Sequence, residues 1–452
     1  MPRTSSIRTV DSRPLQTLGT NVLVVGGGAA GVAAAVAAAR RGAQVLLLER
    51  YGFCGGGAVA GMSGTICGLY EASEDPTAPP RQLVFGFAHE FVELLESRSG
   101  VTPPVRYGKT FSRVHDPLVW RDAADHVLAE AGVQVLLHTQ VIDVLLDGGE
   151  RVAGVVAWTK EGRIEVRADL TIDASGDADL FPLAGLSVRM GDDGSVQNPT
   201  MMFRLAGVNV ERFLAARGAD SILPESVGDS IPESHERREL YLPRAKVFLF
   251  TTPRPGELLC NATRAIGRDG RELNPLVAID LSEAETEGRR QVRQYAEFFR
   301  RHLAGCENTY VNDTGVQVGV RQSRQIVGRS TLANNDVVTG VKRPDGIARS
   351  PWPIELHSGP KPRLHWLFND YYEVAYGCFV PERGLSLLAA GRCLSAQHEA
   401  MASARVTAQC FSYGHAIGIA AAICVQNRLQ PAELAGEDIR AALNRERARL
   451  DV

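Results

Sequence analysis

The sequence predicts an α/β protein built around a parallel sheet, and three observations near its N-terminus carry that prediction. Residues 21–25 (NVLVV) form an apolar, β-branched run of the kind that is buried on both faces of a parallel sheet. Residues 26–31 (GGGAAG) follow at once, fit the pattern GxGxxG and lead into an alanine-rich helix expected over 32–41. A second apolar strand is expected over 44–48 (QVLLL). This order of elements is typical of a dinucleotide-binding unit.

Each small residue of the glycine-rich segment has a physical task in such a unit. Gly26 permits the tight turn after the strand, and Gly28 allows a pyrophosphate to approach the backbone. Gly31 lets the helix pack closely on the strand. Ala29 and Ala30 lead into the helix, whose N-terminal N–H groups attract an anion. We therefore expect these five residues to lie at the cofactor.

An acid and further glycines follow the second strand. Glu49 stands 18 residues after Gly31, where such units place the acid that hydrogen-bonds an adenosine ribose. The segment then continues through Arg50, Gly55, Gly56 and Gly57, and twelve of the 45 glycines lie between residues 26 and 68. So much bare backbone suggests that a large, flat ligand continues past the pyrophosphate. A dehydrogenase that uses only a nicotinamide cofactor has the same unit and stays an alternative.

Local signals place further elements along the chain. Asp116 and Pro117 are suited to the N-cap and first turn of a helix, and the Asp-Gly-Gly-Glu segment 147–150 is suited to a hairpin loop. In chain order we expect a loose leader over residues 1–19, a loop over 72–80, a helix over 83–95, a helix over 117–131, a strand over 133–137, a hairpin of 141–146 with 152–159 and a helix over 399–426.

Composition excludes several classes of function. The 49 basic and 52 acidic residues give a net charge of −3, so we expect no nucleic-acid partner. No apolar run approaches the roughly 20 residues that span a bilayer, so we expect no membrane association. The eight cysteines show neither a CxxC pair nor the spacing of a zinc site, which predicts reduced thiols, no metal and a cytoplasmic location. The oligomeric state, including a homo-oligomer, stays open.

Three blocks of the chain resemble the FAD-dependent oxidoreductases of the two-dinucleotide-binding-domain (glutathione-reductase-like) flavoprotein class. They are residues 26–57, residues 171–180 (TIDASGDADL), and residues 388–406 (LAAGRCLSAQHEAMASARV) with 414–418 (GHAIG). The resemblance implies that the cofactor is FAD. In that class the second block approaches the FAD again, which implies contacts from Ser175, Gly176 and Asp177.

The third block implies further cofactor contacts. It places Gly391, Arg392 and Glu399 near the flavin, and a backbone contact to the adenine is implied near Val141. Arg392 stands where the wider class usually carries an aspartate near the flavin ribitol, so the resemblance leaves the ribitol contact at this position open. Gly414 and Gly418, four residues apart, are expected to permit close helix packing.

The resemblance also implies the domain organisation. We expect a Rossmann-like FAD-binding domain with a parallel sheet and a small antiparallel layer, together with an α+β substrate domain. The FAD-binding domain would comprise residues 20–190 and 371–452, and the substrate domain residues 191–370. No second GxGxxG unit is present, so the sequence does not support a built-in NAD(P)H domain. The electron acceptor stays unknown among oxygen, a quinone, a soluble carrier, free NAD(P)H and a second substrate.

Four side chains are candidates for the chemistry of catalysis. His398 would act as a base or hydrogen-bond donor near the flavin, and Arg405, two helical turns further on, would bind a substrate carboxylate from the same helix face. Arg321 would face the substrate, and Tyr376 would line the pocket with its aromatic neighbours. Each has a structural alternative, namely a helix cap for His398, an ion pair or solvated face for the arginines and a core position for Tyr376.

These residues predict an FAD-dependent oxidoreductase, a dehydrogenase or oxidase that passes a hydride between a small organic substrate and the flavin. We expect oxidation of a C–H bond next to oxygen or nitrogen, on a substrate that is either neutral or anionic. The alternatives are a flavoprotein that reduces an activated alkene, and a flavin-fold subunit or non-redox protein that needs a partner. The sequence does not identify the substrate, the reaction direction, or whether the flavin is covalently bound.

Overall fold

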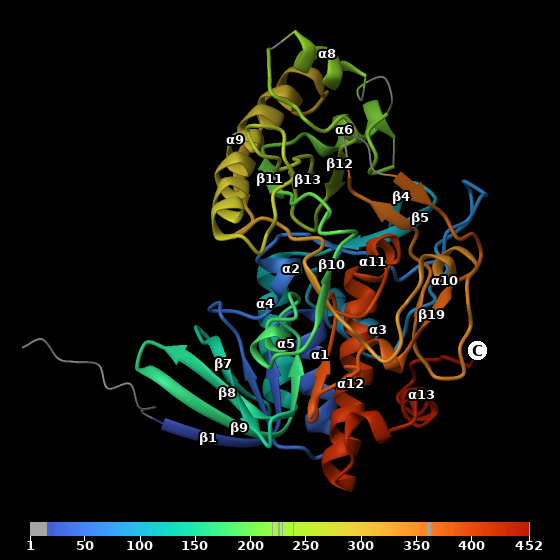
Figure 1. Cartoon of the computed structure of the whole chain (residues 1–452). Helices are drawn as coiled ribbons and strands as arrows, with labels where there is room; N and C mark the ends of the chain where they lie inside the picture. Colours follow the sequence, from blue (N-terminus) through green and yellow to red (C-terminus); the bar gives the residue numbers. More distant parts are fainter. Residues whose placement is uncertain are drawn as a thin grey trace, which may run out of the picture.

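The computed structural model describes residues 16–218, 220–224, 227, 229–237, 239–358 and 363–451. It has a lower body, which holds the main sheet, and an upper part that includes the long helix α9 (Ala278–His302) (Figure 1). Most of the expected leader, residues 1–15, lies outside the described residues. The rest of that prediction is wrong, because residues 16–19 already form the first four residues of strand β1 (Gln16–Val25).

The main sheet confirms the predicted fold class. Its order is β6-β2-β1-β9-β8-β7, and β20 also pairs with β9. Strands β6, β2, β1, β9 and β20 are parallel neighbours, whereas β7 and β8 form the antiparallel layer. The remaining bounds are β2 (Val45–Leu48), β6 (Gln134–Leu136), β7 (Gln140–Asp147), β8 (Arg151–Thr159), β9 (Gly162–Asp173) and β20 (Leu387–Ala389). The carboxyl ends of the parallel strands therefore meet at one edge of the sheet.

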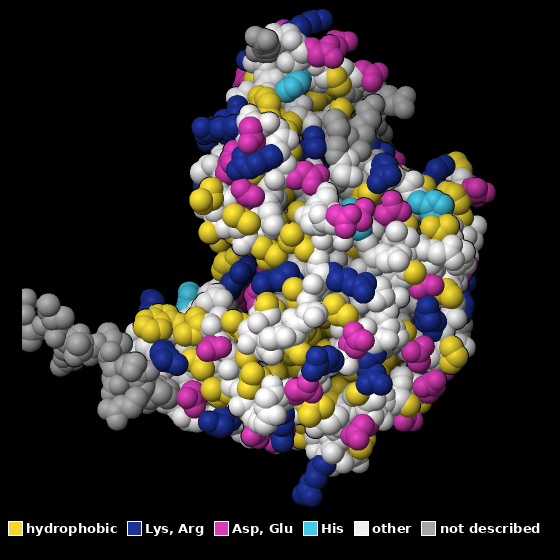
Figure 2. Space-filling view, viewed as in Figure 1, with side chains coloured by type: hydrophobic (Ala, Val, Ile, Leu, Met, Phe, Trp, Pro, Cys, Tyr) yellow, Lys and Arg dark blue, Asp and Glu magenta, His cyan; other side chains and the backbone are white. Residues whose placement is uncertain are grey.

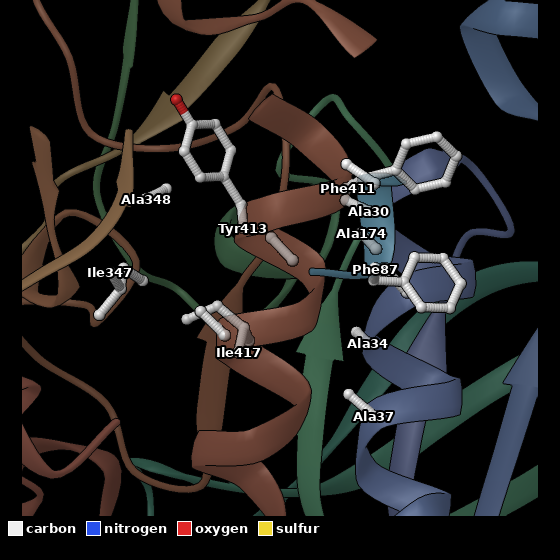
Figure 3. Packing of buried hydrophobic residues seen from close by; sticks show 14 of the residues in the cluster. Ala30, Ala34, Ala37, Phe87, Ala174, Ile347, Ala348, Phe411, Tyr413 and Ile417 are labelled. Carbon is white, nitrogen blue, oxygen red and sulfur yellow. The ribbon is translucent and has the colours of Figure 1, made fainter. Parts of the chain in front are cut away.

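Two apolar helices lie side by side against this sheet. Helix α1 (Ala29–Arg40) packs along α12 (Thr407–Asn427), and Ala30 and Ala34 point toward α12 in Figure 3. The approach is close, because a Cβ atom at Gly414 would lie 2.0 Å from the Ala30 carbonyl oxygen. At Gly418 it would lie 2.2 Å from the Ala34 oxygen. The predicted role of these glycines in close packing is confirmed.

Helix α12 bears on the expectation about membranes. It has 21 residues and is long and apolar enough to cross a membrane, so the expectation that no apolar segment approaches this length is wrong. In the structure, however, 78% of its apolar window is buried inside the protein. Core helices of this kind pass the same test of length and composition.

The rest of the body surrounds these layers. Helix α4 begins as predicted, since the Asp116 carboxylate accepts hydrogen bonds from the backbone N–H groups of Leu118 and Val119. The bounds are α2 (Gly56–Val59), β3 (Thr65–Ile66), α3 (Phe87–Ser97), β4 (Val105–Tyr107), β5 (Thr110–Val114), α4 (Pro117–Glu130), α5 (Leu180–Leu183), β10 (Val188–Met190), β15 (Arg324–Ile326), α10 (Asn334–Val338), β16 (Gly346–Ser350), β17 (Ile354–Leu356), β18 (Arg363–His365), β19 (Tyr372–Ala375), η1 (Tyr376–Cys378), α11 (His398–Ala404), η2 (Pro431–Glu433) and α13 (Gly436–Arg445).

Two predicted helices differ from the structure. Helix α3 begins at Phe87 rather than residue 83, after Gly86 with a positive φ of 64°. The helix predicted over 399–426 is two helices, α11 and α12, separated by Arg405 and Val406. Val406 is extended, with φ −76° and ψ 163°, so its backbone interrupts the helical path.

The upper part has its own core. Its antiparallel sheet has the order β12-β13-β11-β14, and α9 contributes a row of buried apolar side chains to the same core. Its elements are β11 (Phe203–Ala206), α6 (Val210–Arg217), α8 (Ser230–Glu236), β12 (Phe248–Thr251), β13 (Glu257–Asn261) and β14 (Tyr310–Thr314), together with α9. This core comprises residues between Met201 and Val318, whereas Leu332, Ile347 and Leu356 pack in the body. The predicted division at residues 190 and 370 stays a prediction, and the packing changes near residue 320.

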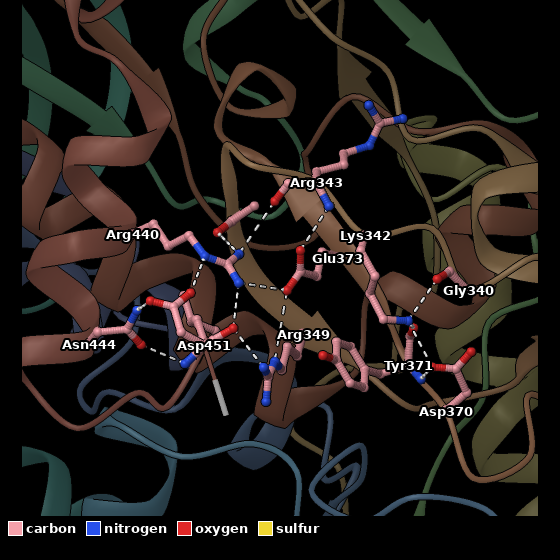
Figure 4. A network of polar contacts seen from close by, with 12 residues as sticks. Gly340, Lys342, Arg343, Arg349, Asp370, Tyr371, Glu373, Arg440, Asn444 and Asp451 are labelled. Carbon is pink, nitrogen blue, oxygen red and sulfur yellow. Dashed lines mark hydrogen bonds and ion pairs between the residues drawn. The ribbon is translucent and has the colours of Figure 1, made fainter.

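A polar network holds helix α13 (Gly436–Arg445) against the body (Figure 4). Glu373 of β19 accepts hydrogen bonds from Arg440 Nη2 at 3.1 Å and from the backbone N–H of Arg343 at 2.8 Å. Arg440 also donates to the Gly346 carbonyl oxygen at 2.9 Å. Because Glu373 is buried, these contacts satisfy a carboxylate that would otherwise be costly to bury. The C-terminal segment is thereby held against β16 and β19, remote from the cleft described next.

Candidate functional site

A long cleft runs from the carboxyl edge of the main sheet to the underside of the upper part. Its empty volume is about 1800 Å³, which includes space open to solvent. All but three of the residues predicted to contact the cofactor line it. These are Gly26, Gly28, Ala29, Ala30, Glu49, Arg50, Gly55, Gly56, Gly57, Val141, Ser175, Gly176, Gly391 and Arg392. The exceptions are Gly31, Asp177 and Glu399.

The glycine-rich turn fits a pyrophosphate. Gly28 is the N-cap of α1 and provides no side-chain hydrogen bond, and the first turn of α1 holds no acidic residue. The N-terminal N–H groups of a 12-residue helix are therefore left available to an anion at the cleft. Gly31 lies behind the turn, where a Cβ atom would come within 1.8 Å of the Gly26 carbonyl oxygen. Gly31 thus acts through close packing, as predicted, and does not itself line the cleft.

Glu49 fixes the same turn to the end of β2. Its Oε2 accepts a hydrogen bond from the Gly27 N–H at 2.6 Å, and its Oε1 accepts one from the Tyr51 N–H at 2.9 Å. Burial raises the pKa of Glu49, and the two backbone hydrogen bonds partly oppose that effect. The carboxylate lines the cleft where an adenosine ribose is expected, and that contact stays a prediction.

Asp177 lies behind the cleft wall and positions Arg392. Its Oδ1 accepts a hydrogen bond from Arg392 Nη2 at 2.8 Å, and Arg392 Nη1 donates to the Ser323 hydroxyl at 2.9 Å. Burial would raise the pKa of Asp177, but Arg392 and Ser323 outweigh it and lower the pKa. Asp177 is thereby held ionised, and the guanidinium of Arg392 is held at the cleft wall.

The far end of the cleft contains a buried acid–histidine pair. Glu355 of β17 lies 3.2 Å from His357, measured from Oε1 to Nε2, and also accepts a hydrogen bond from the Tyr107 hydroxyl at 2.7 Å. Burial would raise the pKa of Glu355, but His357, Tyr107 and Arg405 outweigh it and lower the pKa to about 2. Burial and the nearby Arg321 lower the pKa of His357 well below its usual value. At neutral pH the acid is therefore ionised and the imidazole neutral.

Three arginines surround that pair. Arg321 donates to the Asn198 carbonyl oxygen at 2.8 Å and to the Thr200 hydroxyl. Arg405 donates from Nη2 to Gln197 Oε1 at 3.1 Å. Arg244 does not itself line the cleft, and it donates to Asn261 Oδ1 at 2.6 Å.

These arginines are held close to one another. Burial and the repulsion of Arg244 and Arg405 lower the pKa of Arg321, yet guanidinium groups remain charged in proteins. On the surface, Figure 2 shows basic side chains at the waist between the upper part and the body.

Two of the four predicted catalytic residues line the cleft, namely Arg321 and Arg405. His398 lies half-buried at the start of α11 and does not line it, and Tyr376 is buried with its hydroxyl donating to the Pro431 carbonyl oxygen. Glu399 instead faces Arg363 at 3.5 Å, away from the cleft. The predicted shared helix face of His398 and Arg405 is wrong, because α11 ends at Ala404.

Five residues at the far end of the cleft are not among the predicted site residues, namely Tyr107, Arg244, Trp352, Glu355 and His357. A signal existed for two of them, because Glu355 and His357 are two residues apart in an otherwise apolar run, which places both on one face of a strand. Trp352 lies three residues before Glu355, whereas Tyr107 and Arg244 come from distant segments of the chain. Likewise, His365, Tyr371 and Tyr372, grouped with Tyr376 by sequence, do not line the cleft.

Comparison with known proteins finds a match to one protein family. Residues 21–443 match the family described as FAD dependent oxidoreductase. No curated protein sequence matches the chain. Among solved structures, the chain is similar to a geranylgeranyl bacteriochlorophyll reductase-like protein from Thermoplasma acidophilum, with 14% identity and a TM-score of 0.47 over 95% of this chain and 91% of that chain.

Two further structures are similar. One is a flavin-dependent brominase, with 14% identity and a TM-score of 0.48 over 94% of this chain and 83% of that chain. The other is a p-nitrophenol 4-monooxygenase from Pseudomonas putida, with 15% identity and a TM-score of 0.38 over 66% of this chain and 67% of that chain. These likenesses indicate no particular reaction, so the family match alone carries the classification.

Proposed function

The chain belongs to the family of FAD dependent oxidoreductases, and on that premise we propose that it oxidises a small organic molecule at a C–H bond next to oxygen or nitrogen. The observation that supports this proposal is the ionised Glu355 beside a neutral His357 at the end of the cleft that the cofactor segments open. A carboxylate that orients an imidazole is an arrangement suited to removing a proton from a hydroxyl or amine.

FAD is the cofactor, and the residues at the sheet edge fit it. The free N-terminus of α1 and the half-buried Gly28, which has no side chain in the way, suit the pyrophosphate, and Gly391 and Arg392 line the same cleft. When bound, FAD supplies an acceptor for two electrons and a hydrogen. The chain itself supplies orientation, charge and a proton acceptor.

His357 is the proposed proton acceptor. Its Nε2 faces Glu355 at 3.2 Å, so the tautomer with a proton on Nε2 donates to the carboxylate and leaves the Nδ1 lone pair for the substrate. The Tyr107 hydroxyl occupies the same carboxylate oxygen and helps to hold it in place. Oxidation of an alcohol or amine releases a proton from the O–H or N–H group, and Nδ1 of His357 receives that proton.

The buried arginines support an anionic substrate, and the reduced thiols support a reducing compartment. All eight cysteines are free, which fits the cytoplasmic location that we also propose. Whether the enzyme is a dehydrogenase or an oxidase depends on the electron acceptor, and dioxygen consumption during turnover separates the two.

The test is anaerobic reduction of the FAD-loaded protein by a panel of alcohols, amines, hydroxy acids and amino acids. We expect at least one class to bleach the flavin absorbance. The variant His357→Gln should slow that bleaching by at least about a hundredfold, because a positioned general base contributes on the order of 10²–10⁴. The variant Glu382→Gln, at an exposed glutamate, is the matched control. If no member of the panel bleaches the flavin, or if His357→Gln is as fast as the control, the proposal is wrong.

A further inference from the structure

We propose that the substrate is a small 2-hydroxycarboxylate whose carboxylate is bound by Arg321 and Arg405. This inference rests on the proposed function, and it adds the chemical class of the molecule that the far end of the cleft accepts. Three features of that end support it, namely hydrogen-bond donors without partners, an excess of positive charge and an imidazole held in place by Glu355.

The first feature is a set of donors without acceptors. Arg405 lines the cleft and donates from Nη2 to Gln197, but its buried Nε finds no hydrogen-bond partner among the described residues. Trp352 also lines the cleft, is 1% exposed, and its Nε1 likewise finds no partner within the described part of the chain. Leaving a buried donor unpaired costs about 1–3 kcal/mol, and more when it is charged. A ligand that offers acceptor oxygens would satisfy both groups.

The second feature is the balance of charge. Arg321 and Arg405 line the cleft and Arg244 lies directly behind it, whereas Glu355 is the acidic side chain set against them. Arg321 lies close enough to Arg244 and Arg405 to be repelled by both. Buried charges are stabilised by a counterion, and a carboxylate with two oxygens matches the planar donor pattern of a guanidinium.

The third feature favours a substrate hydroxyl over a substrate amine. Oε1 of Glu355 contacts both the Tyr107 hydroxyl and His357, which holds the imidazole in place at the end of the cleft. A 2-amino acid would bring an ammonium group into a pocket where three guanidinium groups already face one carboxylate. A hydroxyl group carries no charge, and it can present its proton to the neutral imidazole of His357.

The reaction of such a substrate balances without a further reagent. The C2–H bond would break, and bound FAD would serve as the oxidant that accepts its hydrogen and two electrons. The O–H bond breaks, its proton passes to Nδ1 of His357, and the C–O bond becomes a C=O bond. The product is a 2-oxocarboxylate, which retains the carboxylate bound by the arginines.

Binding of unreactive probes tests this inference without turnover. FAD-loaded protein is titrated with oxalate, which mimics the planar product, and with its neutral isostere oxamide, and binding is followed by the flavin absorbance spectrum and by calorimetry. We expect oxalate to bind and oxamide not to bind. The variants Arg405→Gln and Arg321→Gln should each weaken oxalate binding at least tenfold. The variant Arg289→Gln, on the exposed side of α9, changes the net charge equally and should leave it unchanged.

Two outcomes would overturn the inference. One is equal binding of oxalate and oxamide, or oxalate binding that survives both arginine substitutions in protein that still retains FAD. The other is flavin reduction by an uncharged alcohol or a 2-amino acid that is faster than reduction by every 2-hydroxycarboxylate tested. In that case the proposed oxidation stands and the substrate class is wrong. If oxalate binds through the arginines but no compound reduces the flavin, the proposed oxidation fails while carboxylate recognition stands.

Discussion

Replacing Glu355 by glutamine removes a buried charge at the far end of the cleft while keeping the size of the side chain. The structure sets the magnitude of the effect. The pKa of Glu355 falls from an ordinary value of 4.5 to about 2, and a drop of this size corresponds to about 3 kcal/mol of stabilisation of the ionised form. Part of that drop comes from a positive charge on His357, which the imidazole does not carry at pH 7. Glutamine imitates the protonated acid, so at pH 7 Glu355→Gln should lower the free energy of unfolding by about 1–3 kcal/mol.

The dependence on pH has a definite sign. Because the pKa is depressed in the folded protein, the stabilisation is fully present above pH 4.5 and is lost as the pH falls toward about 2. The difference in the free energy of unfolding between the native protein and the variant should therefore fall by roughly 1 kcal/mol when the pH is lowered from 7 to 4. Urea unfolding of the FAD-loaded proteins, followed by tryptophan fluorescence at both pH values, measures this difference.

The exposed Glu382→Gln serves as the control for this experiment, and it should change the free energy of unfolding by no more than a few tenths of a kcal/mol. Two results would refute the electrostatic stabilisation of the Glu355–His357 pair. One is a difference in the free energy of unfolding below about 1 kcal/mol at pH 7, and the other is a difference that does not change with pH.

Three other perturbations have expected outcomes. The variant Gly414→Ala places a Cβ atom 2.0 Å from the Ala30 carbonyl oxygen, so we expect a loss of about 1–3 kcal/mol in urea unfolding, whereas Gly19→Ala, in open space, should be neutral. The variant Gly31→Ala places a Cβ atom 1.8 Å from the Gly26 carbonyl oxygen and should weaken FAD binding at least tenfold by equilibrium dialysis with flavin fluorescence; unchanged affinity would contradict the role of the turn. Arg321 helps to lower the pKa of His357, and a bound anion offsets the charge of Arg321 and so raises that pKa. Oxalate should therefore bind more tightly as the pH falls, and calorimetry should show that a proton is taken up on binding. The variant His357→Gln should abolish the proton uptake.

The fold could be predicted where its signals are local in the sequence. The second half of strand β1, the glycine turn and α1 follow from the consecutive residues 21–41, and the start of α4 follows from Asp116 and its next few residues. The interruption between α11 and α12 could not be predicted in this way. Both sides of it have helix-forming composition, and the extended backbone at Val406 arises where Arg405 reaches the cleft.

The candidate site shows the same division. Its cofactor end is built from contiguous motifs such as residues 26–31 and 174–176, so spacing and resemblance identify it. Its far end brings together Tyr107 of β4, Arg321 from the segment between β14 and β15, and His357, which follows β17. These residues lie far apart in the sequence and meet only in the folded chain. His398 illustrates the error, since nearness to a cofactor motif in sequence does not fix where a side chain lies.

The most direct test of the central claim is a crystal structure of the FAD-loaded protein soaked with oxalate. The account predicts the FAD pyrophosphate at the N-terminus of α1 beside Gly28, and the oxalate at Arg405 and Arg321 with His357 within hydrogen-bond reach of it. FAD bound away from the glycine turn would contradict the account of the cofactor site. Oxalate bound away from the arginines, or out of reach of His357, would contradict the proposed chemistry.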